Sequence, residues 1–108
     1  FNRVLDDDTT EFMVLEYDSD IIGQLRFDFD EKYPVISISL NKKYRGLGLS
    51  KYLLNKGINY IEENYNQNTL IADIKKSNAR SISFFEAMGF KKEYGIRNGS
   101  ALRFIYRG

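Results

Sequence analysis

The sequence contains no cysteine and no histidine. Without cysteine there are no disulfides, no thiolate zinc sites and no thiol nucleophile. Without histidine there are no Ser-His or Cys-His catalytic couples and no histidine-bound metals. Any chemistry in this chain must therefore use carboxylates, tyrosine, serine, lysine, backbone amides or water, and we predict no metal site.

Long hydrophobic runs are also missing. No apolar segment approaches the about 20 residues that a helix needs to cross a bilayer, and none resembles a signal peptide, so we expect no membrane association. With 108 residues, of which 43% are hydrophobic, residues 1–108 are predicted to form one soluble domain with a single core. The lack of cysteine fits a cytoplasmic protein. Because the chain begins with Phe1 and not with Met, we expect it to be N-terminally truncated or excised from a longer chain.

The net charge of +1 conceals an uneven distribution along the chain. Residues 1–34 hold ten acidic and three basic side chains, a net charge of −7, so residues 35–108 carry +8. A polyanionic ligand would be attracted to the second part. The alternative is an ordinary solvated surface whose charges happen to segregate. Nucleic-acid binding is not expected, because the sequence has no basic helix and no aromatic RNA-binding signature.

Hydrophobic periodicity predicts an α/β (α+β) domain of the order β-β-β-α-β-α-β-β. Residues 1–5 are interpreted as a helix end and residues 6–10 as a polar loop. A short link at residues 18–20 predicts a hairpin, and Asn98-Gly99 predicts a turn. The helical crossover predicts that the third and fourth strands are parallel. We expect strands over residues 12–17, 21–29, 35–40, 69–74, 90–94 and 102–106, and helices over residues 49–65 and 79–88.

A glycine-rich turn, Arg45-Gly46-Leu47-Gly48-Leu49-Ser50, separates the third strand from the first helix. A turn of this kind at a helix N-terminus forms a nest of backbone N–H groups that binds anions, usually phosphate. A dinucleotide fingerprint would require glycine at position 51, which is lysine, and the nucleoside-triphosphate loop pattern is absent. The alternative is a plain strand–helix turn whose glycines only relieve strain.

A second motif runs from Asn78 to Phe90 with the sequence NARSISFFEAMGF. Taken alone, it predicts a helix capped by Asn78 and terminated by Gly89. Together with the glycine turn about 30 residues earlier, it resembles the GNAT superfamily of N-acetyltransferases over about residues 12–106. Two departures from the family pattern are Ser50, in place of the final small residue of the turn, and Phe85, where many members have tyrosine.

The resemblance implies a GNAT fold: a mixed, mostly antiparallel sheet that splays between strands 35–40 and 69–74 to admit acetyl-CoA, with CoA as a product. It also implies that the family's N-terminal strand and most of its first two helices are missing. The turn would hold the pyrophosphate, the third strand would pair with the pantetheine arm, and the second helix would line the thiol end. The cofactor-binding residues implied are Ile38, Ser39, Leu40, Arg45, Gly46, Leu47, Gly48, Leu49, Ser50, Lys51, Asn78, Ser81, Phe84 and Phe85.

The implied reaction is direct attack of an amine on the thioester, which requires neither cysteine nor histidine. The backbone N–H of Leu40 would act as oxyanion donor. Glu16 or Asp28 is a candidate base, although each can equally be a surface carboxylate. Phe85 cannot donate a proton to the leaving thiolate, so Tyr94 or water would do so.

The acceptor is less well indicated. The strand 23–28 and the pair Phe84-Phe85 are similar to amino-sugar-nucleotide N-acetyltransferases of the pseudaminic and legionaminic acid type, some of which are fused to another enzyme. Arg26 and Asp28 would then bind substrate, or Arg26 would simply pair with Asp28 on an exposed strand. Two alternatives stay open: an N-acetyltransferase of protein N-termini, and a non-catalytic CoA-binding module. A homodimer or a fusion partner is compatible with each.

Overall fold

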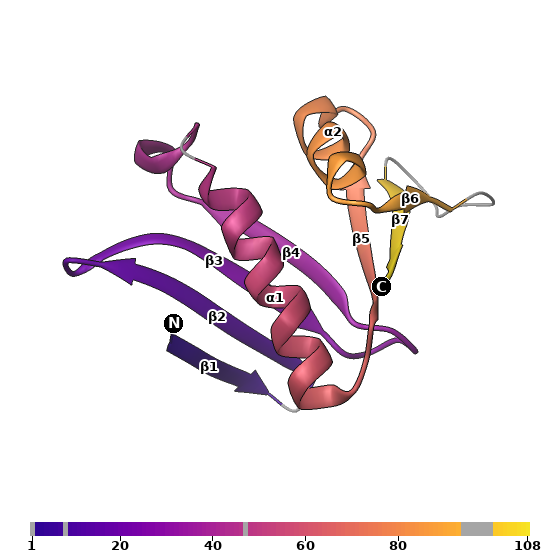
Figure 1. Cartoon of the computed structure of the whole chain (residues 1–108), viewed down its shortest axis with the longest axis horizontal. Coiled ribbons are helices and arrows are strands. Elements are labelled where there is room, and N and C mark those ends of the chain that lie inside the picture. Colours follow the sequence, from indigo (N-terminus) through magenta and orange to yellow (C-terminus); the bar gives the residue numbers. More distant parts are fainter. Residues whose placement is uncertain (1, 8, 47, 94–100) are drawn as a thin grey trace.

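The computed structural model describes residues 2–7, 9–46, 48–93 and 101–108 as one mixed sheet with two α-helices (Figure 1). The strands are β1 (Asn2–Asp7), β2 (Thr10–Tyr17), β3 (Asp20–Asp28), β4 (Val35–Leu40), β5 (Thr69–Lys75), β6 (Lys91–Lys92) and β7 (Ala101–Arg107). The helices are the short 3₁₀ helix η1 (Lys42–Tyr44) and the α-helices α1 (Leu49–Tyr65) and α2 (Ala79–Ala87). This arrangement confirms the predicted GNAT fold.

The strands lie in the order β1-β2-β3-β4-β5-β7-β6. All neighbouring pairs are antiparallel except β4 and β5, which are parallel, as the helical crossover predicts. These two strands meet at one register pair, Val35 with Ile71, and the Ile71 N–H donates to the Pro34 carbonyl at 2.9 Å. Beyond this point β4 and β5 diverge (Figure 1), which is the predicted splay.

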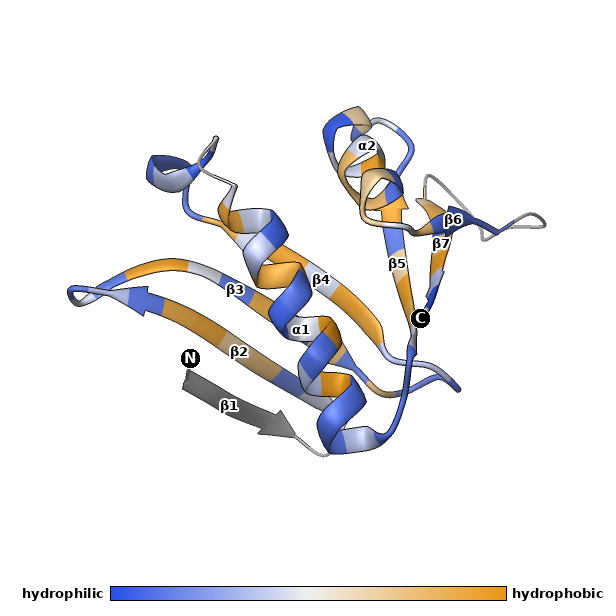
Figure 2. Cartoon of the chain, in the orientation of Figure 1, coloured by the Kyte–Doolittle hydropathy of each residue, from blue (hydrophilic) through white to orange (hydrophobic). Residues whose placement is uncertain are grey.

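The core lies between α1 and the sheet. Leu25 and Phe27 of β3 and Leu53, Leu54 and Ile61 of α1 are fully buried, as the alternation along β3 and the helical stripe in α1 predict. Figure 2 shows the hydrophobic and hydrophilic residues alternating along α1, which lies across β2, β3 and β4. The hydrophobic effect therefore fixes α1, and with it the glycine turn, against the first half of the sheet.

Gly57 brings α1 close to the sheet. A Cβ at this position would lie 2.9 Å from Leu25 Cδ1 and 3.2 Å from Phe27 Cζ. We expect Gly57→Val to lower the free energy of unfolding by about 2 kcal/mol, because it overpacks a filled core. Asn55→Val is the matched control, since it adds the same branched side chain to an exposed position of α1. Urea denaturation of both variants measures the difference, and equal losses would contradict the close packing at Gly57.

Several predicted boundaries agree with the structure and some do not. The predicted bounds of β4 and α1 are confirmed, and Asp18 and Ser19 form the hairpin turn with positive φ. The interpretation of residues 1–5 as a helix end is wrong, because β1 occupies residues 2–7 and pairs antiparallel with β2. Strand β1 was therefore missed in the sequence. The predicted polar loop at 6–10 is too long, because its first two residues belong to β1 and its last residue belongs to β2. A period-2 pattern is hard to recognise in six residues of which two, Asp6 and Asp7, are acidic.

The C-terminal predictions are borne out in part. Strand β7 is one residue longer at each end than predicted, whereas β6 covers Lys91–Lys92 among the described residues 90–93 of the predicted strand 90–94. Phe90 instead packs into the core, 4.9 Å from the Phe85 ring, and Gly89 ends α2 with a φ of +96°. The predicted turn at Asn98-Gly99 lies outside the described residues.

Two polar clusters connect distant elements. The buried carboxylate of Glu11 accepts hydrogen bonds from the hydroxyls of Tyr60 and Tyr65 and so ties the end of α1 to β2. Burial and this carboxylate raise the pKa of Tyr65, which therefore stays neutral at any physiological pH.

The second cluster joins the two halves of the splayed sheet. The Arg103 side chain in β7 is only 8% exposed, and it donates to both Asp73 of β5 and Glu31 of the β3–β4 loop. The shortest distances are 2.7 Å from Nη2 to Asp73 and 2.6 Å from Nη1 to Glu31. Glu31 thereby holds the loop before β4 against the β5–β7 pair.

Candidate cofactor and acceptor site

The splay between β4 and β5 opens into a cavity of about 570 Å³. Its walls come from the end of β4, the glycine turn, the first turn of α1 and one face of α2. The residues that line it are Ile38, Leu40, Arg45, Gly46, Ser50, Asn78, Arg80, Ser81, Phe84 and Phe85. The tertiary structure thus brings the two sequence motifs, about 30 residues apart, to one site.

The glycine turn requires glycine because of its backbone conformation. Gly46 and Gly48 have φ of +83° and +76°, in the left-handed region that most side chains avoid. A Cβ on either residue would meet no protein atom within 4 Å, so close packing is not the reason. The backbone on this side of the turn is therefore open to a ligand.

The N-terminus of α1 presents unpaired donors to this space. Gly48 is the N-cap and supplies no side-chain hydrogen bond, and no acidic residue occupies the first turn. The first N–H groups of a helix have no partner within the helix and carry partial positive charge. With Arg45 and Arg80 on the wall and no carboxylate among the lining residues, the site favours a polyanion.

The backbone of β4 faces the cavity at alternate residues. The Asn41 N–H donates to the Ile22 carbonyl of β3 at 2.8 Å, whereas the Pro34 carbonyl faces β5. Because backbone groups alternate in direction along a strand, those of Ile38 and Leu40 point away from β3, toward the side that β5 has left. An extended ligand can bind there as an added strand.

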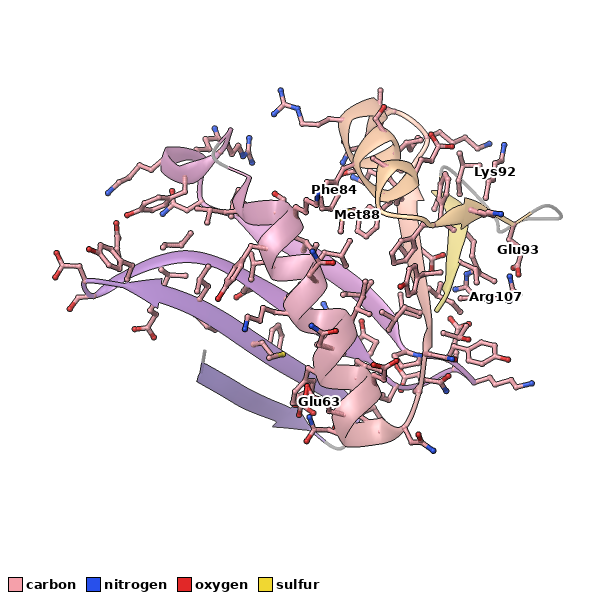
Figure 3. The ribbon with its side chains drawn as sticks, viewed as in Figure 1. Glu63, Phe84, Met88, Lys92, Glu93 and Arg107 are labelled. Atoms are coloured by element: carbon pink, nitrogen blue, oxygen red, sulfur yellow. The ribbon has the colours of Figure 1, made fainter. Side chains whose placement is uncertain are left out.

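Helix α2 contributes a polar N-terminus and an aromatic wall. The Asn78 side chain caps the helix by accepting from the Ser81 N–H at 3.2 Å. Phe84 packs edge-on against Phe85, and Figure 3 shows Phe84 and Met88 on the side of α2 that faces α1. Phe85 is buried against Phe90, so this position offers an apolar ring and no hydroxyl.

Arg80 lines the cavity but was missed in the sequence. It is the second residue of α2, where the helix dipole disfavours a cation and acidic residues are preferred. An arginine at this unfavourable place is the sequence signal that could have pointed to Arg80 as an anion-binding residue.

The structure brings nine of the fourteen predicted cofactor residues to the cavity wall. Gly48, Leu49 and Lys51 lie in the adjoining turn and helix start without lining it, and Leu47 lies outside the described residues. Ser39 is the exception that the geometry explains. It is the partner of Gln24 on β3, so its backbone groups point to β3 and not to the cavity.

The predicted catalytic and substrate residues are spread more widely. Leu40 is at the cavity, and Tyr94 lies outside the described residues. Glu16 is exposed near the end of β2, next to a register shift. Arg26 and Asp28 form an ion pair of 3.1 Å, and Asp28 also accepts from the Thr10 hydroxyl at 3.0 Å. Asp28 pairs with Val35, about 17 Å along the strand from Leu40.

A second, smaller cavity of about 320 Å³ lies at the start of β3 and the end of β4. The residues that line it are Ile21, Ile22, Gly23, Gln24, Ser39, Leu40 and Asn41. Beside it, the Asp20 carboxylate accepts from Tyr44 Oη at 2.6 Å and from Lys43 Nζ at 2.9 Å. The hydrogen bond from Tyr44, and after it the one from Lys43, lowers the pKa of Asp20. The hydrogen bond between Tyr44 and Asp20 also raises the pKa of Tyr44.

Among the described residues, no helix has the length and apolarity needed to cross a bilayer. The same part of the chain shows no group of three or more acidic side chains placed to hold a metal ion.

Comparison with known proteins identifies the family. The acetyltransferase (GNAT) family matches residues 1–90, and the chain belongs to this family. An N-alpha-acetyltransferase of Sulfurisphaera tokodaii is 26% identical over 100 residues, which cover 81% of this chain and 60% of that protein. An uncharacterized N-acetyltransferase of Methanocaldococcus jannaschii is 30% identical over 81 residues, which cover 74% of this chain and 52% of that protein. The chain thus spans a little over half the length of these curated relatives.

Solved structures support the fold. An F149G mutant of the spermidine N-acetyltransferase SpeG from Vibrio cholerae superimposes with a TM-score of 0.82 at 17% identity, over 94% of this chain and 66% of that one. The PaiA N-acetyltransferase from Thermoplasma acidophilum, in complex with coenzyme A, gives 0.81 at 19% identity, over 93% of this chain and 62% of that one.

Proposed function

We propose that this protein is an acetyl-CoA-dependent N-acetyltransferase that acetylates the primary amine of a small molecule by direct attack. The observation that carries the proposal is the larger cavity. At this cavity the β4 N–H groups that point away from β3, the N-terminus of α1, which no side chain caps, and Arg80 of α2 come together. Membership of the acetyltransferase (GNAT) family supports the same activity.

The residues of the cavity fit acetyl-CoA by their chemistry. Arg45, Arg80 and the N–H groups of the turn and of α1 would bind the phosphates, each charge-assisted hydrogen bond contributing about 1.5–3 kcal/mol. Ser50 adds a hydroxyl donor on the same wall. Ile38 and Leu40 would hydrogen-bond the pantetheine arm, and Phe84 and Phe85 would exclude water from its thiol end.

The reaction needs few groups from the protein. Acetyl-CoA supplies an acetyl group activated as a thioester. The amine nitrogen bonds to the acetyl carbon, the carbon–sulfur bond breaks, and the thiolate leaves with the electron pair. The Leu40 N–H would stabilise the developing oxyanion. Since a free alkyl amine has a pKa of about 10.4, the ammonium loses one proton before the attack, either to water or to Glu16. The nitrogen loses a second proton as the amide forms, and this proton passes through water to the leaving thiolate.

The acceptor we propose is an amino sugar nucleotide, with Arg26 near its phosphates. Arg26 is half exposed, so its ion pair with Asp28 leaves the guanidinium accessible to a second anion. A second candidate, acetylation of protein N-termini, is favoured by the relative from Sulfurisphaera tokodaii, which is named an N-alpha-acetyltransferase. A CoA-binding module without catalysis is favoured by Phe85, which offers no proton.

Turnover with a panel of amines tests these alternatives. We expect saturable acetyl-CoA binding in calorimetry, and CoA release with UDP-linked amino sugars at least tenfold faster than with spermidine or an alanyl peptide. Thiol release is followed spectroscopically, and the acetylated product is identified by mass spectrometry. Binding without turnover of any amine would reject the enzyme, and preference for the peptide would favour the second candidate. A folded protein that binds no acetyl-CoA would contradict the whole proposal.

A further inference from the structure

The two cavities share one residue, Leu40, at the end of β4. In the proposed function the Leu40 N–H marks the position of the thioester carbonyl. The amine has to reach that carbonyl from a side that the cofactor does not fill. The smaller cavity is lined by Leu40 and by no residue of α1 or α2.

The polar side chains of the smaller cavity project from the opposite face of the sheet. Leu25 of β3 is buried against α1, so its neighbour Gln24 points to the other face. Ser39 is the register partner of Gln24 and points to the same face. The two cavities therefore approach Leu40 from different sides of β4, which is the arrangement that an acyl donor and its acceptor need.

The lining of the smaller cavity is uncharged. Its polar side chains are Gln24, Ser39 and Asn41, and the remaining lining residues are apolar or glycine. Asn41 is held by its own hydrogen bonds, from Nδ2 to the Ile21 carbonyl and from the Lys43 N–H to Oδ1. The neighbouring carboxylate of Asp20 is engaged by Lys43 and Tyr44. Such a surface can hydrogen-bond to hydroxyl groups. It offers no negative charge to the further ammonium groups of a polyamine.

We propose that the smaller cavity binds the acceptor, a small hydroxyl-rich molecule with one amino group, and directs its amine past Leu40 to the thioester. Gln24 and Ser39 hydrogen-bond its hydroxyls and determine specificity. The volume of about 320 Å³ accommodates a single sugar ring. This assignment depends on the proposed function for its chemistry, but the binding itself can be measured separately.

Two serines of β4 provide a matched test. Ser37 and Ser39 lie on the same face of the same strand and are both exposed, but only Ser39 lines the cavity. With a UDP-linked amino sugar that the enzyme acetylates, we expect Ser39→Val and Gln24→Met each to lower kcat/KM about tenfold through KM of the acceptor. Ser37→Val is expected to change it less than twofold, and KM for acetyl-CoA is expected to stay constant in all three. Equal effects of Ser37→Val and Ser39→Val would overturn the assignment.

Binding without turnover gives an independent measurement. In ¹⁵N-correlation spectra of the CoA-bound protein, glucosamine is expected to shift the amides of Gly23, Ser39 and Asn41 saturably, and Ser39→Val is expected to abolish the shifts. Stronger binding of spermidine at these amides, or glucosamine shifts confined to other residues, would overturn the proposal. If glucosamine binds here but no amine is acetylated, the pocket stands and the proposed enzymatic function fails.

Discussion

Replacing Gly48 with aspartate is expected to lower the affinity for acetyl-CoA about 100-fold, which corresponds to about 3 kcal/mol. The residue is the N-cap of α1, and its neighbours Leu49 and Ser50 begin the helix whose free N–H groups face the cavity. An aspartate side chain would itself accept hydrogen bonds from these N–H groups and would place a negative charge where we propose that the phosphates bind. Calorimetric titration with acetyl-CoA measures the loss.

Gly48→Asn is the matched control for this prediction. Asparagine has the same shape as aspartate, caps helices equally well and tolerates the left-handed φ of +76° at this position. Both variants should therefore lose a similar, small amount of thermal stability, and only the charged one should lose most of its cofactor affinity. A loss in Gly48→Asn as large as in Gly48→Asp would show that backbone geometry, and not charge, decides binding at this turn.

Replacing Arg103 with methionine is expected to lower the free energy of unfolding by about 3 kcal/mol, because two carboxylates would lose their shared cation. Asp73 and Glu31 accept from this one guanidinium across the base of the splayed sheet. For a domain of this size the change corresponds to a fall in Tm of more than 10 °C. Calorimetric or circular-dichroism melting measures it.

Glu31→Gln is the informative comparison. The Glu31 side chain is 43% exposed, so water replaces part of the lost interaction, and we expect a loss of less than about 1 kcal/mol. If Arg103→Met were no more destabilising than Glu31→Gln, the buried ion-pair network would not hold the two halves of the sheet together.

The periodicity of the sequence was enough to predict most of the fold. The bounds of β4 and α1 and the parallel pairing of β4 with β5 follow from local patterns: alternation in Val35–Leu40, a helical stripe from Leu49 and a helical crossover. The N-terminal strand was not predicted, because β1 is short and acquires its structure by pairing with β2.

The candidate site was predicted through its motifs but not through its geometry. The glycine turn and the Asn78–Phe90 segment carry signals in their own residues, namely left-handed glycines and a capping asparagine. Arg80 belongs to the site because α2 lies across the cavity from the end of β4, which no local pattern reveals. The pairing of Arg26 with Asp28 was one of the two alternatives that the strand periodicity left open.

The sequence by itself determined the family, the order of the elements after β1 and the lack of cysteine and histidine side chains, because these depend on residue types and short-range spacing. Only the tertiary structure decided which residues meet across the splay of β4 and β5. It directed the backbone of Leu40 to the larger cavity and that of Ser39 to β3, since hydrogen bonding to one neighbour leaves alternate N–H groups facing the other side. It also placed a second cavity at Leu40. This cavity results from the pairing of β3 with β4 and cannot be predicted from a local sequence pattern.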